Sequence, residues 1–422
     1  MRRISKFERT QWPVGHGGFH TGRLQCGGAD IHYFYDCGAS SEAGKRLIKR
    51  KLSTEKFDFG VISHFDSDHF AAIGDATGLN TLLLPYLTET DVLFCVCAEL
   101  SDRRTAPKAL AYYSMIAALR RKNVSVVMVR GDGAPDSAGH RGVGDTEPRP
   151  DERPADARTP RLIGLPAADS LCVVTIGHHA PITCGTNDDV ILEFKFYNHR
   201  HNEVAVEFRQ ALDDACDTLV DLSGAKWASI DAFLAALETD DAAELVKQNT
   251  SALKAIYTTT MKKYPARGIT PTNLSSLTLF SRSISLRDAR PFLHYDDSLG
   301  RWRLAVSSSL FKRSVPCDYD GWMLTGDLEL TDAVWGAFYR HYFVEMSLCV
   351  AVNVPHHGSA IAMHDEAIHH LGGGRFFLFP VNADDAKHPA PELTVRMQKY
   401  EVTGQHSVTA APESQFSLTS TW

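Results

Sequence analysis

The stretch Ser63–His69, which reads SHFDSDH, decides how this chain folds and what it binds. It comes at the end of the apolar run at 57–63, which predicts a short buried strand. If the chain leaves that strand extended, His64 and Asp66 project to one side, and Asp68 and His69 turn inward from the start of the next helix. Such a set offers two pairs of ligands to two cations about 3.5–4 Å apart. Helix capping explains one of these residues, not four.

Three shorter clusters follow three further apolar runs. They are Leu324–Asp327 (LTGD), Val354–Ser359 (VPHHGS) and Lys387–Pro389 (KHP). A Gly-Asp turn, a surface histidine pair or a solvated loop histidine explains each cluster when it stands alone. Because ligands in layered α/β folds gather beyond strand ends, four clusters after four strands favour one shared site. In that site the two oxygens of Asp327 can bridge two metal ions.

Composition limits the class of protein. The chain has 422 residues, 44% of them hydrophobic and 23% charged, which suits a globular protein with a sizeable core. The net charge of −7 argues against a protein that coats nucleic acid by bulk charge, although a local basic groove remains open.

The same sequence carries no membrane or secretion signal. No run approaches the roughly 20 apolar residues that cross a bilayer, and the basic start of the chain has no apolar run after it. The nine cysteines are scattered and odd in number, which favours a reducing cytoplasm over a disulfide framework. We interpret Cys95 and Cys97 as two thiols of a buried segment.

Alternating strands and helices predict a layered α/β architecture in a single domain over residues 1–422. Residues 131–160, rich in Pro, Gly, Asp and Arg, predict a flexible insertion, and residues 205–268 predict a helical insertion or cap. Around the cap we expect an edge strand at 204–208 and one helix at 230–261. The strand at 31–35 is expected to end in a turn at 36–38, before a surface helix at 40–52.

The motifs, in order along the chain, resemble those of the metallo-β-lactamase superfamily. They are D-C-G at 36–38, S-H-x-D-x-D-H at 63–69, L-T-G-D-L-E at 324–329, V-P-H-H-G-S at 354–359 and H-P at 388–389. More narrowly, the chain resembles the branch with the extracellular-facing domain of the competence protein ComEC, in which Asp stands where most relatives have a second His, here Asp66. Asn273–Leu277 also resembles a short strand motif of that branch. The resemblance covers residues 15–90 and 270–395.

This resemblance implies a fold and a ligand set. The fold is a four-layer αβ/βα metallo-β-lactamase sandwich with the site at one edge of its two sheets. His64, Asp66 and Asp327 would hold one metal ion. The other ion would be held by a second set that shares one residue with the first: Asp68, His69, Asp327 and His357. The spacing to Ser359 favours His357 as the last ligand, and His356 would then support the ligands or reach the first ion.

The resemblance also implies supporting roles. Asp36 would be a buried residue that orients the metal-binding loop. Asn273 and Ser359 are candidates to bind substrate, and His388 is a candidate to contact the scissile group or to donate a proton. Members of the superfamily usually have one more histidine ligand between the first cluster and the bridging Asp. The pair at 178–179 is the candidate here, although its surroundings match poorly and the ComEC-like branch lacks that ligand.

Together these features predict a dinuclear metal-dependent hydrolase. The ions would be Zn²⁺ or Mn²⁺, since carboxylate-rich coordination favours harder ions. We expect a hydroxide that bridges the metals to attack a phosphodiester, with Asp68 orienting it and His388 or His356 helping the leaving oxygen. The ComEC-like branch and RNase Z imply DNA or RNA as substrate, and five basic residues at 45–51 lend support.

Other functions remain open. A small-molecule phosphodiesterase or esterase, acting on a phosphocholine ester or a cyclic nucleotide, fits the acidic net charge, and the segment at 230–261 would be its lid. A non-catalytic metal-binding scaffold is disfavoured, because a protein that has lost catalysis is expected to have lost at least one ligand, and here the set is complete. β-Lactam hydrolysis is disfavoured because Asp66 replaces the usual histidine.

Overall fold

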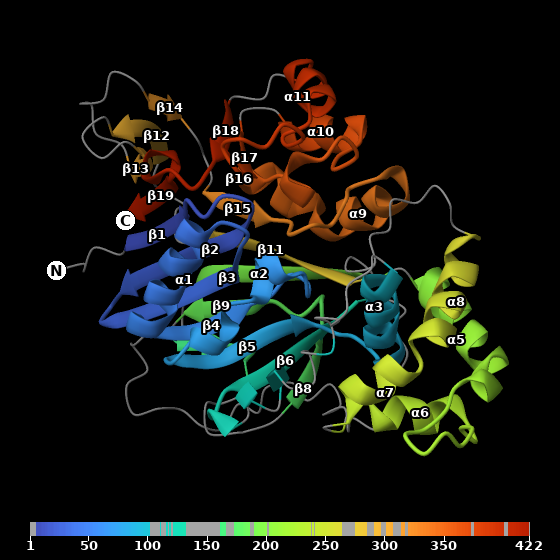
Figure 1. The fold of residues 1–422 in the computed structure, drawn as a ribbon. Helices are drawn as coiled ribbons and strands as arrows, with labels where there is room; N and C mark the ends of the chain where they lie inside the picture. Colours follow the sequence, from blue (N-terminus) through green and yellow to red (C-terminus); the bar gives the residue numbers. More distant parts are fainter. Residues whose placement is uncertain are drawn as a thin grey trace.

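The computed structural model describes residues 6–421 apart from a set of internal segments (Figure 1). The segments left out are 102–109, 111–114, 117, 120, 132–160, 166–172, 186–189, 201, 238, 240, 264–274, 285–290, 297–300, 307–313, 317–319, 373–374 and 401–403. Asn273 and almost all of the insertion predicted at 131–160 therefore lie outside the described residues.

Two eight-stranded sheets form the body of the molecule. In spatial order the first sheet consists of β19 (Phe416–Thr421), β1 (Lys6–Gln11), β2 (Gly17–Cys26), β3 (Ala29–Ala39), β4 (Phe57–Val61), β5 (Leu79–Pro85), β6 (Ser125–Arg130) and β8 (Val173–Gly177). The strands from β3 to β8 are parallel. The chain ends meet in this sheet, because β19 pairs with β1 (Figure 1).

The second sheet has strands from the later part of the chain. In spatial order they are β18 (Gly404–Val408), β17 (Phe376–Pro380), β16 (Cys349–Asn353), β15 (Gly321–Leu324), β11 (Ser275–Ser283), β10 (Val190–Arg200), β9 (Ile182–Gly185) and β7 (Arg161–Ile163). The four strands from β15 to β18 are parallel. A separate small sheet contains β13 (Arg301–Val306), β12 (Pro291–Asp296) and β14 (Ser314–Pro316).

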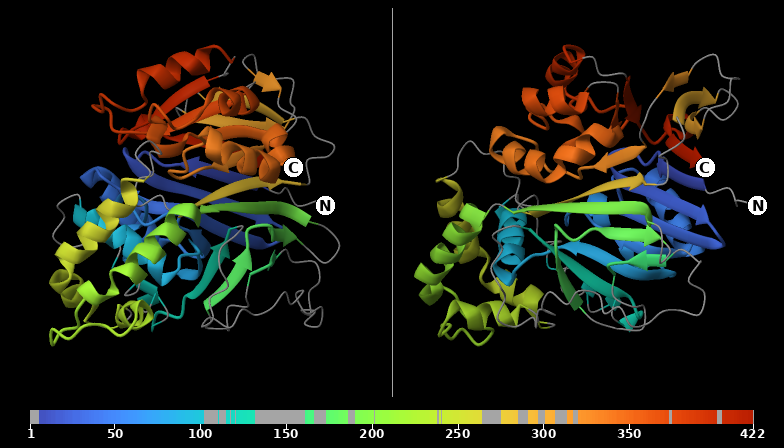
Figure 2. Two further views of the ribbon diagram at one scale, coloured as in Figure 1. Left: turned by 90° about the vertical axis from the view of Figure 1, so that its right-hand side faces the viewer. Right: turned by 180° about the vertical axis from the view of Figure 1, so that it is seen from behind.

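Helices cover the outer faces of both sheets (Figures 1 and 2). On the first sheet lie α1 (Glu42–Thr54), α2 (Ser67–Phe70) and α3 (Glu89–Ser101). On the second lie α9 (Asp332–Leu348), α10 (Asp365–Gly372) and α11 (Pro391–Gln398). The predicted mixed α/β sandwich is confirmed. Among the described residues, no helix has both the length and the apolarity that crossing a membrane requires.

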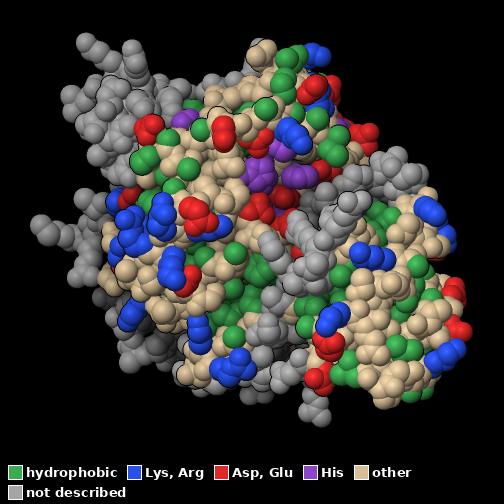
Figure 3. Space-filling model, viewed as in Figure 1, with side chains coloured by type: hydrophobic (Ala, Val, Ile, Leu, Met, Phe, Trp, Pro, Cys, Tyr) green, Lys and Arg blue, Asp and Glu red, His purple; other side chains and the backbone are tan. Residues whose placement is uncertain are grey.

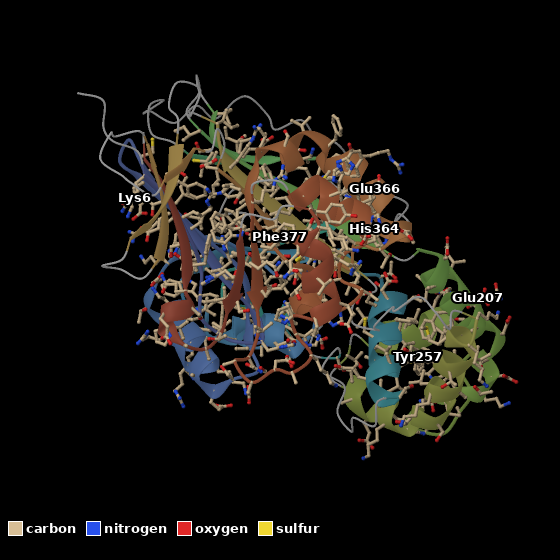
Figure 4. The ribbon with its side chains drawn as sticks, turned by 90° about the horizontal axis from the view of Figure 1, so that it is seen from above. Lys6, Glu207, Tyr257, His364, Glu366 and Phe377 are labelled. Carbon is tan, nitrogen blue, oxygen red and sulfur yellow. The ribbon has the colours of Figure 1, made fainter. Side chains whose placement is uncertain are left out.

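Three apolar cores bind these layers together. Between the sheets, the rings of Tyr33, Phe59 and Phe194 meet with centroids 5.1–5.2 Å apart. One outer core joins α1 to the first sheet, and the other joins α9, α10 and α11 to the second, with Phe377 of β17 in the interior (Figure 4). The parallel strands β5, β16 and β17 are buried along nearly their whole length, as strands covered on both faces must be.

A helical unit stands beside the sandwich and has its own apolar core (Figures 2 and 4). It consists of α5 (Asn202–Asp214), α6 (Ile230–Ala236), α7 (Ala242–Gln248) and α8 (Thr250–Met261), which pack against α3. Cys95 and Cys97 of α3 are buried in this core, as interpreted from the sequence, and burial raises the pKa of both thiols.

Three local predictions are wrong. Residues 204–208 lie in α5, where the burial of Val204, Phe208 and Leu212 follows a helical period and not a strand period. The single helix predicted at 230–261 is three helices, with one break capped by Asn249. Asp36-Cys37-Gly38 is no turn, because β3 continues through it to Ala39 with a shift of register opposite β2.

A buried ion pair ties the two sheets together near the chain ends. The guanidinium of Arg9 on β1 lies 3.3 Å from Oδ2 of Asp320, and both side chains are almost fully excluded from solvent. Arg9 also donates to the backbone oxygen of Ser281 on β11 at 3.0 Å. Asp320 accepts from the backbone N–H of Ser283 and from the hydroxyl of Ser420. One residue of the second sheet thus anchors both the first and the last strand of the chain.

We expect Asp320→Asn to lower the free energy of unfolding by about 3–5 kcal/mol, because it leaves the buried Arg9 charge uncompensated. The matched control is Asp30→Asn, which removes an equivalent but exposed pair with Arg23 and should cost less than about 1 kcal/mol. Urea unfolding of both variants measures the difference. Equal costs for the two would show that the buried pair does not hold the sheets together.

Candidate metal centre

The four sequence clusters meet at one edge of the sandwich, where strands of the two sheets end. Ser63–His69 follows β4 of the first sheet, and the other three clusters follow β15, β16 and β17 of the second. A backbone hydrogen bond from Leu277 to Ser63 joins the two sheets here, and one from His356 to Gly326 joins two of the clusters of the second sheet. Figure 3 shows His and acidic side chains gathered in a hollow on this face.

The centre of the cluster is the buried carboxylate of Asp327. Its Oδ2 lies 3.4 Å from Nε2 of His64, and its Oδ1 lies 3.4 Å from Nε2 of His69. Nε2 of His357 lies 3.8 Å from the same Oδ1. Both carboxylate oxygens therefore face imidazole nitrogens on different sides, the arrangement expected of a residue that bridges two ions.

Asp68 lies on the second side of this cluster. Its Oδ2 is 3.5 Å from Nε2 of His357 and 3.9 Å from Nε2 of His69. His16, from the connection between β1 and β2, joins Asp68 and His357 in a group whose potential ligand atoms all lie within 4.8 Å of one another. A first group of the same kind contains His64, His69 and Asp327.

These separations are too long for good hydrogen bonds, and the three shortest, at 3.4–3.5 Å, are those of ligands around a shared ion. Two atoms that each lie about 2.0–2.2 Å from a tetrahedral ion are about 3.3–3.6 Å apart. A hydrogen bond would instead be close to 2.8 Å, as between Nδ1 of His69 and Oδ2 of Asp36. The Nε2 atoms of His64, His69 and His357 are buried and have no hydrogen-bond partner among the described residues. The residues present therefore fit a metal centre.

A hydrogen-bond acceptor behind each imidazole determines that Nδ1, and not Nε2, carries the proton of the neutral ring. His69 donates from Nδ1 to Asp36, and His357 donates from Nδ1 to the backbone oxygen of Pro380, both at 2.8 Å. Ser63 gives its hydroxyl proton to Asp36, so its oxygen accepts from Nδ1 of His64 at 2.9 Å. When these rings are neutral, each Nε2 lone pair points into the cluster, ready to bind a cation.

Asp36 holds the Ser63–His69 loop from behind through its carboxylate. Its carboxylate accepts from the backbone N–H of Ser63 at 2.7 Å, from the Ser63 hydroxyl at 2.8 Å and from His69. It has a positive φ of 58°, which a residue without special support avoids. His356 and His357 share this conformation, with φ of 47° and 54°. The fold thus holds Asp36 of β3 and the His356–His357 turn in a backbone state that costs about 1–2 kcal/mol per residue.

Protonation within the cluster follows from its mixed charge. Burial lowers the pKa of His69, but the carboxylates of Asp327, Asp36 and Asp68 outweigh it, so that the pKa lies well above its usual value. Burial raises the pKa of Asp327, but the three surrounding histidines outweigh it and hold that pKa well below its usual range. A divalent cation would take the place of the protons that the carboxylates otherwise attract.

Two further histidines lie beside the cluster, and each is held by a carboxylate. Nδ1 of His388 lies 3.1 Å from Asp385, and Nδ1 of His356 lies 2.8 Å from Glu329. Burial lowers the pKa of His356, but the hydrogen bond with Glu329 and nearby carboxylate charges raise it above its usual value. Both rings are partly exposed, with centroids 6.3 Å apart. They could pass a proton to a bound molecule.

Not every predicted residue joins the cluster. Asp66 precedes α2 and makes no capping hydrogen bond, but it is in neither ligand group, and its charge acts on Cys95 of α3. Ser359 ends the turn after His357, with its hydroxyl buried. His178 and His179 form a separate group with His341 of α9, which shares no residue with the groups around Asp327.

The sequence analysis missed three residues of the site, namely His16, Glu329 and Asp385. Burial, followed by the neighbouring charge of His357, lowers the pKa of His16 to about 4, so this ring is neutral at pH 7. The available signal was the run Gly15-His16-Gly17-Gly18, in which glycines permit close approach of a backbone. A Cβ on Gly17 would lie 2.6 Å from the backbone oxygen of Asp68.

Comparison with known proteins adds no name to this site. No protein-family model matches the sequence, and no curated protein matches it either. The interpretation of the site therefore depends on its geometry and on the sequence motifs.

We expect Asp36→Asn to weaken divalent metal binding by about 10–100-fold, because it removes one acceptor from the network that orients His64 and His69. The control is Asp58→Asn, a partly buried carboxylate on neighbouring β4 that accepts from the backbone of His32. Competition with a chromophoric chelator measures both affinities. Unchanged affinity in Asp36→Asn would show that this network does not position the ligands.

Proposed function

We propose that this chain is a dinuclear metal-dependent hydrolase of the metallo-β-lactamase fold that cleaves phosphodiester bonds in DNA or RNA. The observation that carries the proposal is the set of imidazole nitrogens and carboxylate oxygens around Asp327, spaced 3.4–3.8 Å apart and buried. The double-sheet sandwich and the place of the motifs beyond β4, β15 and β16 support the fold assignment.

Each ion has its own set of protein ligands. His64, His69 and Asp327 would hold one, and Asp68, His357 and the other oxygen of Asp327 would hold the second. The mixture of imidazole and carboxylate donors suits Zn²⁺ or Mn²⁺. When bound, the ions supply a nucleophilic hydroxide near neutral pH and stabilise the negative charge of the transition state.

The protein's own residues position and protonate the reacting groups. Asp68, whose carboxylate lies between His357 and His69, orients the attacking oxygen. His388 and His356 lie beside the ligands with their Nδ1 atoms engaged by Asp385 and Glu329, so that Nε2 of each is the atom that can hand a proton to the leaving oxygen. Asp36 holds the first ligand loop from behind.

The proposed polymer substrate is supported by the basic helix α1. The start of α1 lies beside the site. The backbone N–H of Ser40 and the hydroxyl of Ser41, just before the helix, donate hydrogen bonds to the loop that carries His16. Lys45 and Lys49 form exposed pairs with Glu42 and Asp75, and Arg46 and Arg50 are also exposed. Figure 3 shows Lys and Arg side chains over this part of the surface, next to the hollow. A phosphate backbone that enters the hollow could cross this helix.

The first test is cleavage of four substrates by metal-loaded protein. Native protein and Asp327→Asn are assayed with single-stranded DNA, double-stranded DNA, RNA and bis-p-nitrophenyl phosphate, after stripping and reloading with Mn²⁺ or Zn²⁺. We expect the native protein to cut a nucleic acid and Asp327→Asn to lose both activity and bound metal, because one carboxylate serves both ions. Cleavage of the small ester alone would favour the small-molecule phosphodiesterase. Silence on all four would contradict a phosphodiesterase.

The role of α1 is tested separately. We expect Arg46→Gln combined with Arg50→Gln to raise KM for the polymer, because two contacts with phosphates are lost. The slope of the logarithm of KM against the logarithm of the salt concentration should fall by the amount that corresponds to about two phosphate contacts. KM for the small ester should change little. Arg209→Gln, on the distant helical unit, is the control for the loss of a surface arginine away from the site. The same loss with both substrates would show that α1 acts through the fold and not by contacting a polymer.

A further inference from the structure

The loop that carries His16 is built to stay against the metal-binding loop. The backbone N–H of His16 donates to Oδ1 of Asn382 at 3.1 Å, and its backbone oxygen accepts from the backbone N–H of Ser40 at 2.9 Å. Gly15 and Gly17 have φ of 77° and 130°, which side-chain-bearing residues rarely adopt. Both sides of His16 are therefore fixed, and its ring is placed by the fold.

The ring of His16 lies between two carboxylates and against a ligand histidine. Its Nδ1 is 3.3 Å from Oδ2 of Asp385, and its centroid is 3.7 Å from that of His357. With Asp68 and His357 it forms a group of potential ligand atoms within 4.8 Å of one another. His16 thus reaches the side of the cluster that His64 does not occupy.

His16 repeats the pattern of the other histidines of the site. In His64, His69 and His357 the Nδ1 atom is held by an oxygen, and Nε2 is left for the centre of the cluster. Asp385 stands behind His16 in the corresponding place, with its Oδ2 3.3 Å from Nδ1. A carboxylate behind the distal nitrogen is the usual support of a metal-binding imidazole, because it fixes the ring and raises its basicity.

We propose that His16 binds the second metal ion through Nε2, together with Asp68 and His357, and that Asp385 positions it. This inference rests on the proposed function and deepens it. It also resolves the ligand count: without His16 the second position has one imidazole, one carboxylate and a shared oxygen of Asp327. With His16 each ion would have two imidazoles and at least one carboxylate oxygen.

The competing account places His16 in a pair with His388, which also lies against Asp385. In that account both rings sit beside the site and neither touches the metal. The two accounts differ in what the removal of the imidazole does to bound metal. A ring beside the site leaves two ions bound, whereas loss of a ligand weakens one of them.

The test is a titration of metal-free protein with Mn²⁺, followed by metal analysis after dialysis and by electron paramagnetic resonance. The variants are His16→Gln and Asp385→Asn, and His32→Gln, a partly buried histidine on β3 outside the cluster, is the control. Gln keeps the loop polar, and the loop is held by backbone contacts, so the variants should melt like the native protein without metal. Asp385→Asn leaves every histidine in place, so it tests the same inference if His16→Gln does not fold.

We expect native protein and His32→Gln to bind two ions with the spectrum of a coupled pair. His16→Gln should bind the second ion at least about 100-fold more weakly and give an uncoupled spectrum, and Asp385→Asn should weaken it about 10–100-fold. Two ions of native affinity in both His16→Gln and Asp385→Asn would overturn the inference and leave the proposed function standing. A native chain that binds fewer than two ions would overturn the proposed function together with the inference.

Discussion

The rest of the site depends on one buried carboxylate, that of Asp327, among three imidazole nitrogens. A buried charge costs several kcal/mol unless opposite charge and hydrogen bonds surround it. Here the imidazoles stand 3.4–3.8 Å away, at the spacing of ligands and not of hydrogen-bonded partners. A divalent cation on each side of the carboxylate would satisfy both requirements, because it would bring opposite charge and bind the imidazole nitrogens that surround Asp327.

The architecture serves this constraint. Parallel strands of two sheets end at one edge, which brings together loops that are far apart in the sequence. Glycines let these loops approach: a Cβ on Gly326 would lie 2.6 Å from that of Ser63. Asp36, His356 and His357 are held at positive φ, a state that the surrounding hydrogen bonds must stabilise. These close approaches and hydrogen bonds fix the candidate ligand side chains relative to one another.

The sequence predicts the local parts of this arrangement, and the position of the four clusters after four strands also predicts that they meet in one place. The apolar run of β4 and the SHFDSDH stretch after it are adjacent, so their relation is visible in the sequence. His16 was missed because its partners Asp385 and Asp68 are distant in sequence, and a single histidine among glycines has no periodicity. The D-C-G stretch was predicted to be a turn because Asp and Gly are common turn residues. In the structure, hydrogen bonds that Asp36 accepts from Ser63 and His69 keep this stretch in β3. Val204–Phe208 was misread because β-branched residues favour strands, and packing on α8 overrides that preference.

The central claim is that the groups around Asp327 hold two divalent ions. The most direct measurement is anomalous X-ray diffraction from crystals grown with Mn²⁺ or Zn²⁺, with data collected on both sides of the metal's absorption edge. The account predicts two anomalous peaks about 3.5–4 Å apart, one on each side of the Asp327 carboxylate. A cluster with no anomalous peak, in crystals soaked at millimolar metal, would contradict it.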